Sequence, residues 1–179
     1  MAEPRRARVR RRAQNTCEYC QLPQRASILP HQIDHIIAQQ HRDSHQESNL
    51  CLCCLRCNLK KGPNIASTDP EDRGEYRLVA LFHPRQQRWQ EHFQLREDGR
   101  LEGLTPEGRA TARLLDFNAE ERVQLRRLLM RHGWRPYILP ATVRDVEFFD
   151  HTAVYGWCTE GFNTADLQEA KALLEELGA

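Results

Sequence analysis

Short apolar runs and polar stretches alternate along the first third of the chain and predict two strands joined by a loop. Apolar and β-branched residues across 27–37 predict the first strand, and the polar stretch 39–48 predicts the loop. Residues 49–52 alternate in character as a second strand would, with Leu50 and Leu52 facing the core.

Helical segments are predicted on both sides of these strands. The strongly basic stretch 5–14 is typical of a short helix or arm. Residues 54–61 suit one or two helical turns that end at Gly62, with Pro63 just beyond. The predicted order is therefore basic helix, strand, loop, strand and short helix.

The later chain predicts further elements of both kinds. An apolar run covers 78–82, and residues 93–104 resemble a hairpin that turns at Asp98-Gly99. Thr105 and Pro106 predict the start of a helix that runs to about Leu115.

A second helix of this region is predicted to begin at Asn118 and to end at Gly133. Glu121 stands three residues after Asn118, as in a capping box. The apolar residues of this helix are expected in the core rather than on a binding surface: Val123, Leu125, Leu128 and Leu129.

Four regions follow from these patterns. They are a basic arm (1–16), a core (17–66), an extension packed on the core (67–133) and an appendage of unknown role (134–179). The appendage is expected to carry a final helix from near Asn163, and no chemical motif is evident in it.

Composition narrows the class of protein. Hydrophobic residues make up 40% and charged residues 28% of the 179 residues, a balance typical of a globular protein. The longest apolar run, residues 50–55, is much shorter than a membrane span, and no apolar stretch follows the basic N-terminus as in a secretory signal. We therefore expect a cytoplasmic protein, whose seven cysteines are metal ligands or free thiols rather than disulfides.

The positive charge is concentrated at one end. Residues 1–65 hold 11 Lys and Arg against 5 Asp and Glu, and the remainder holds 15 against 20. This asymmetry favours a polyanionic partner such as nucleic acid, with Arg8, Arg11 and Arg12 as candidate phosphate contacts. A solvated charged face is the alternative interpretation.

Two CxxC pairs predict a structural zinc site. Cys17 and Cys20 form one pair, and Cys54 and Cys57 form the other, each at the spacing that tetrahedral Zn²⁺ accepts. Pairing Cys51 with Cys54 has the same spacing, and metal-free buried thiols are a further alternative. The four preferred cysteines would bring together the ends of the segment that contains Asp34-His35.

The residues between and beside these pairs suit phosphodiester hydrolysis. A neutral imidazole can take a proton from water, which is the role we expect for His35. Asp34 and Asn58 offer hard oxygen ligands for a catalytic Mg²⁺ or Mn²⁺. Lys60 and Lys61 are further candidates for nucleic-acid binding.

The motifs CEYC, HQIDHII and NLCLCCLRCNLKKG together resemble the HNH endonuclease family, in its variant with two zinc-binding pairs. The resemblance implies an α+β protein with a ββα-metal core, and divalent-metal-dependent cleavage of DNA. It places the general base on His35, the metal ligands on Asp34 and Asn58, and a loop-fixing catalytic residue on Asn49. Gln32 departs from the Glu or His that many relatives carry at its position.

Other functions are compatible with part of the pattern. A zinc-stabilised nucleic-acid-binding module without cleavage would explain the cysteines and the basic arm, but not Asp34-His35 together with Asn58. A protein-interaction adaptor that acts through its acidic C-terminal helix is a third class of function.

His41 and His45 could bind a metal, although solvated side chains are the simpler interpretation. One active site cuts one strand at a time, so double-strand cleavage would need a homodimer or rebinding.

Overall fold

A computed structural model describes residues 4–41, 45–74 and 77–136 of the chain. All of them belong to the first of two compact units, Met1–Leu139. The expected final helix near Asn163 lies outside the described residues. No helix in the described part of the chain is long and apolar enough to span a membrane.

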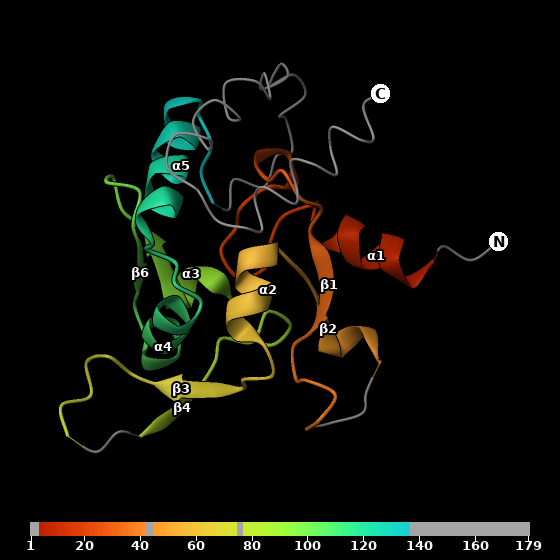
Figure 1. Ribbon diagram of the computed structural model, residues 1–179, viewed down its shortest axis with the longest axis horizontal. Coiled ribbons are helices and arrows are strands. Elements are labelled where there is room, and N and C mark those ends of the chain that lie inside the picture. Colours follow the sequence, from red (N-terminus) through yellow and green to blue (C-terminus); the bar gives the residue numbers. More distant parts are fainter. Residues whose placement is uncertain (1–3, 42–44, 75–76, 137–179) are drawn as a thin grey trace, which may run out of the picture. The chain divides into compact units, whose positions relative to one another are not determined.

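Two short antiparallel strands and one helix form the centre of the first half. Strand β1 (Gln32–His35) pairs with β2 (Leu50–Cys53), and helix α2 (Leu55–Lys61) follows β2 directly and contacts β1 (Figure 1). The ββα order and the mixed α+β class predicted from the sequence are thereby confirmed. The first strand is shorter than predicted, because the backbone bends at residues 28–29 and again at 36–37, and only Gln32–His35 pairs with β2. A turn of 3-10 helix, η1 (Gln24–Ala26), lies before this segment.

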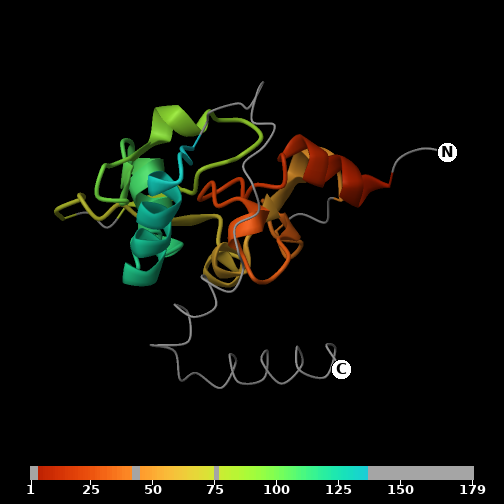
Figure 2. The ribbon, with the colours of Figure 1, turned by 90° about the horizontal axis from the view of Figure 1, so that it is seen from above.

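The two faces of this strand pair carry different side chains. Ile33 lies opposite Leu52 and packs with it, whereas Asp34 lies opposite Cys51 on the other face. Helix α1 (Arg5–Arg12) lies beside the strand pair (Figure 2) and contacts β2. Its Val9 forms one buried cluster with Leu50 and Leu52 of the first face. The other face is directed to α2 and the cysteines, so β1 delivers Asp34 and His35 to opposite sides.

The extension consists of two small hairpins and three helices. Its elements are β3 (Ala66–Thr68), β4 (Leu78–Ala80), α3 (Trp89–His92), β5 (Phe93–Leu95), β6 (Leu101–Gly103), α4 (Pro106–Leu114) and α5 (Glu120–Arg131). β3 pairs with β4 and β5 with β6, both antiparallel. The extension contacts the N-terminal half through Trp89, whose Nε1 donates to the Tyr19 carbonyl at 2.7 Å.

The hairpin and the first helix of the extension follow local sequence signals. Gly99 adopts φ +84° in the β5–β6 turn, a conformation that favours glycine. The Thr105 hydroxyl accepts the backbone N–H of Gly108 at 3.1 Å and caps α4, with Pro106 at its first position. Both predictions are confirmed.

The start of α5 differs from the prediction. Asn118 is not its N-cap, because the Asn118 amide instead bonds the backbone N–H and C=O of Leu101 in β6. The helix begins at Glu120 after Ala119. Its buried residues also differ: Val123 and Leu129 are buried as expected, but Leu125 and Leu128 are only half-buried. Two arginines, Arg122 and Arg126, are buried in their place.

Carbonyl groups explain why these arginines can be buried. The Arg126 guanidinium donates to the carbonyls of Gly99 and Phe117, both at 2.6 Å. The Arg122 guanidinium donates to the Leu115 carbonyl at 2.6 Å. Buried charges of this kind persist only when their donors are bonded. Burial nevertheless lowers the pKa of Arg126 to about 10.

Candidate functional site

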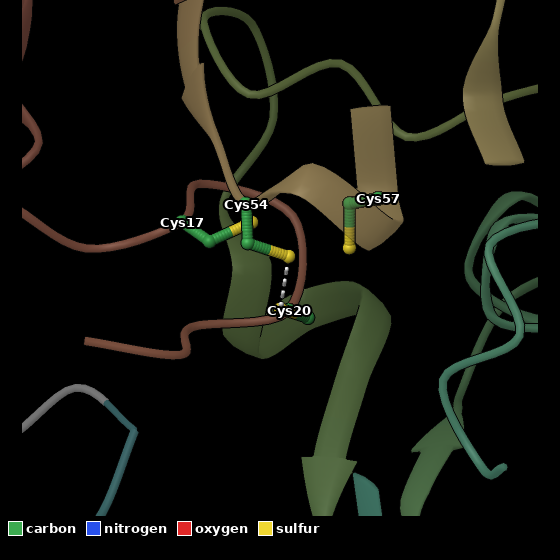
Figure 3. Close-up of side chains that lie close together, drawn as sticks. All are labelled: Cys17, Cys20, Cys54 and Cys57. Carbon is green, nitrogen blue, oxygen red and sulfur yellow. Dashed lines mark hydrogen bonds between the residues drawn. The ribbon is translucent and has the colours of Figure 1, made fainter. Parts of the chain in front are cut away.

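The four cysteines of the two CxxC pairs meet in one buried cluster. Cys17 and Cys20 come from the loop after α1, Cys54 precedes α2, and Cys57 lies in its first turns (Figure 3). Their sulfur atoms all lie within 4.8 Å of one another, and those of Cys20 and Cys54 are 3.8 Å apart. A tetrahedron with Zn–S bonds of about 2.3 Å has edges of about 3.8 Å, so this cluster fits a structural zinc ion.

The protonation of these thiols bears on metal binding. Burial raises the pKa of Cys17 and Cys57 well above the usual thiol value, and hydrogen bonding to Cys17 and Cys20 raises that of Cys54. Hydrogen bonding from Cys17 and its two other neighbours lowers the pKa of Cys20. Zinc binding must therefore displace protons from most of the cluster, and its affinity is expected to fall as pH falls.

The cluster decides between the two spacings that the sequence left open. Cys51 and Cys53 are buried free thiols on β2 and are not members of the group that could hold a metal. Burial raises the pKa of Cys51 to about 12, as expected of a thiol that packs like a small apolar side chain. The preference for Cys54 and Cys57 over Cys51 is confirmed.

Helix α5 contributes a positive charge to the cysteine cluster. The Arg122 guanidinium donates to the Cys57 sulfur at 3.1 Å and lies over the Phe117 ring. A zinc ion with four thiolates has a net charge of −2, which Arg122 partly balances. Sequence reasoning missed this residue, because a helix of alternating charge gives no signal of which arginine turns inward.

The Asp34 carboxylate lies at the end of β1 on the α2 face. One oxygen accepts the backbone N–H of His35 at 2.8 Å. The other, Oδ2, is buried and has no hydrogen-bond partner, although the Lys61 ammonium lies 3.4 Å away. A buried carboxylate oxygen that accepts no hydrogen bond is a suitable ligand for a hard divalent cation.

Lys61 is not the surface residue that the sequence suggested. Its side chain is 1% exposed, and its ammonium donates to the carbonyls of His35 at 2.8 Å and Gly62 at 3.2 Å. A contact with nucleic acid would require breaking these bonds. Lys61 instead fixes the end of α2 to the end of β1.

Asn58 lies on the same side of β1 as Asp34. Its amide nitrogen donates to the Gln32 side-chain oxygen at 2.7 Å, and no hydrogen bond joins it to Asp34 among the described residues. Gln32 and Asp34 are two residues apart on one strand and so share a face. Because this bond uses the amide nitrogen, the side-chain oxygen of Asn58 can still bind another partner. The residues present therefore fit a divalent cation held by oxygen ligands.

His35 follows Asp34 and faces a second histidine. Its Nε2 lies 3.1 Å from Nδ1 of His45, and the two rings meet edge to face with centroids 5.1 Å apart. His41, by contrast, contacts the Pro63 carbonyl. The structure thus does not pair His41 with His45 as a metal site.

Asn49 joins β2 to the segment that follows His35. Its side-chain oxygen accepts the backbone N–H of Ile37, and its amide donates to the Ile37 carbonyl, both at 2.9 Å. Asn49 is buried, so these bonds satisfy polar groups that water does not reach. They fix the path of the chain just beyond His35.

The basic residues selected from the sequence have different environments. Arg8 pairs with Glu47, and Arg12 donates to the carbonyls of Leu50 and Glu47, so both support the segment before β2. Arg11 is exposed, and exposed Lys60 pairs with Asp116 at 3.3 Å. Arg8 and Arg12 therefore have structural bonds that nucleic-acid binding would compete with.

The fold and the site define a class of protein: a small ββα unit held by a cysteine cluster, with an Asp-His pair at the strand end. Residues 17–64 match the family model of the HNH endonucleases. This match confirms the resemblance that the motifs of this segment have to the HNH endonuclease family. No curated protein and no solved structure matched the chain.

Proposed function

We propose that this protein is a divalent-metal-dependent DNA endonuclease. The observation that carries the proposal is the buried Oδ2 of Asp34, which has no hydrogen-bond partner, next to His35 in the chain and within the segment that matches the nuclease family. A nucleic-acid-binding module needs neither group.

Different residues of the protein have different roles in hydrolysis. Asp34, together with the side-chain oxygen of Asn58, would hold Mg²⁺ or Mn²⁺. When bound, such a cation supplies charge neutralisation at the phosphate and at the leaving oxygen. His35 removes a proton from the attacking water, and the hydroxide that forms attacks phosphorus. Lys61 holds the backbone at His35, and Asn49 holds it two residues further on, at Ile37.

DNA is the proposed substrate because the N-terminal end is basic. Arg5, Arg6 and Arg11 of α1 are exposed and offer positive charge to phosphates.

The zinc cluster supports the fold around the site and takes no part in the reaction. The protein acts in the cytoplasm.

A test of this function compares Asp34→Asn with Asp98→Asn in plasmid nicking with Mg²⁺, Mn²⁺ or a chelator. Asp98 lies in the exposed β5–β6 turn and provides a matched control. Wild type and Asp98→Asn should nick DNA with metal and not with chelator. Asp34→Asn should bind the catalytic metal more than about tenfold more weakly and lose nicking in proportion. DNA binding by wild type without cleavage in either metal would favour the binding-module function.

A further inference from the structure

A chain of polar side chains connects His35 to the loop that precedes β2. Nε2 of His35 lies 3.1 Å from Nδ1 of His45, and Nε2 of His45 lies 3.3 Å from the side-chain amide of Gln39. Gln39 and His45 stand near the two ends of the polar stretch after β1. Neither residue is a zinc ligand or one of the oxygen ligands assigned above.

This arrangement determines which nitrogen of His35 is available for chemistry. A hydrogen bond to His45 engages Nε2, and no hydrogen bond to Nδ1 is found among the described residues. An imidazole can act as a base only through a nitrogen that has no proton. If Nε2 donates its proton to His45, then Nδ1 is the nitrogen with the lone pair.

We propose that His45 is a positioning residue, which holds the His35 ring and keeps its proton on Nε2 so that Nδ1 accepts the proton of the attacking water. The proposal rests on the proposed endonuclease function of the same site. The water gives one proton to Nδ1 and its hydroxide attacks phosphorus, while Nε2–H remains bonded to His45. The bond from phosphorus to the leaving oxygen breaks, and the leaving oxygen takes a proton from solvent water. No proton has to pass through His45.

The side chain of Gln39 completes this arrangement. If His45 accepts at Nδ1, its own proton is on Nε2 and needs an acceptor. The Gln39 amide nitrogen lies at that position, and a half-turn of the amide places its oxygen there without moving other atoms. With the oxygen inward, the Nε2–H of His35 and the Nε2–H of His45 each meet an acceptor.

Two variants of His45 separate positioning from a merely structural role. The Asn side chain places an acceptor where His45 has Nδ1, whereas the Gln side chain places one nearer to Nε2. We therefore expect His45→Asn to keep most of the cleavage rate. His45→Gln and His45→Ala should lower kcat about tenfold, a part of what general-base catalysis contributes, with KM for DNA unchanged. Equal loss in Asn and Gln variants, or a change confined to KM, would overturn the proposal.

A second measurement does not depend on nuclease activity. The nitrogen chemical shifts of ¹⁵N-labelled histidine report which ring nitrogen carries the proton, and are recorded on the zinc-loaded protein without DNA in mildly alkaline solution. His35 should be a single Nε2–H tautomer in wild type and in His45→Asn, and a mixture of tautomers in His45→Ala and His45→Gln. If His35 in wild type is a mixture of tautomers, or carries its proton on Nδ1, the positioning role is refuted even when cleavage is observed. If the tautomers behave as expected but wild type does not cleave, the endonuclease proposal fails by itself.

Discussion

The cysteine cluster and the Asp34-His35 end of β1 lie in one small unit but are built in different ways. The cluster is buried, and the spacing of each CxxC pair brings two of its four sulfur atoms together. Asp34 and His35 diverge from one strand end, and each is held by residues from other segments, such as Lys61 and His45. The comparison indicates that residue spacing specifies the metal cluster, whereas supporting contacts specify the candidate active site.

The largest effect is expected from removing a zinc ligand. Cys57→Ser, or a strong chelator, should unfold the unit around β1, β2 and α2, since structural zinc in small domains contributes about 10–16 kcal/mol to folding. Cys51→Ala is the matched control, because Cys51 is equally buried but lies outside the cluster. Circular dichroism with zinc quantification measures both. A cooperatively folded Cys57→Ser variant without zinc would contradict the structural role of the metal.

Arg122→Met tests how far the cysteine cluster depends on the extension. This change removes the donor to Cys57 and to the Leu115 carbonyl from a buried position. We expect a loss of about 3 kcal/mol in the free energy of unfolding, measured in urea. Arg127→Met, on the exposed side of the same helix, should cost less than about 1 kcal/mol. Equal costs would mean that the Arg122 contact contributes nothing specific.

Lys61→Met tests how far Lys61 stabilises the Asp34-His35 end of β1. The methionine keeps the apolar part of the side chain but leaves the His35 carbonyl and the Asp34 carboxylate without the ammonium. The expected loss is about 2 kcal/mol, less than for a fully buried ion pair because Asp34 is 19% exposed. Lys60→Met is the control, since that surface pair with Asp116 is worth less than about 1 kcal/mol. Indistinguishable urea midpoints would show that Lys61 does not fix the strand end.

The smallest effect concerns the contact between α1 and the segment before β2. Hydrogen bonding from Arg8 lowers the pKa of Glu47 below its usual range. A lowered folded-state pKa stabilises the protein above the unfolded pKa, and this stabilisation is lost as pH falls through the folded pKa. Glu47→Gln should therefore slightly flatten the acid side of the stability curve, measured as melting temperature against pH. An unchanged acid slope would show that the pair is too solvated to matter.

The sequence predicted those parts of the molecule that depend on neighbouring residues. The CxxC spacing, the Asp98-Gly99 turn and the Thr105 cap are local signals, and each has the predicted structure. Asn118 also carried a local capping signal, but its amide is bonded to Leu101, seventeen positions away. Strand β3 has no strong strand pattern and is defined by its pairing with β4.

The same distinction holds within the candidate site. Asp34 and His35 could be selected because their chemistry is visible in the residue types. The burial of Lys61 and the pairing of His35 with His45 depend on how the segments fold together, so spacing gave no indication of them. Supporting residues are therefore the part of such a site that a structure adds.

The most direct test of the central claim is metal-dependent plasmid cleavage by zinc-loaded His35→Ala, compared with His41→Ala. Both changes remove a histidine from the same part of the chain, and the His41 ring contacts the Pro63 carbonyl and the side chain of its neighbour Gln40. The account predicts that wild type and His41→Ala cleave DNA in Mg²⁺ or Mn²⁺, and that His35→Ala cleaves roughly 100-fold more slowly with zinc content unchanged. Cleavage by His35→Ala at the wild-type rate would contradict it.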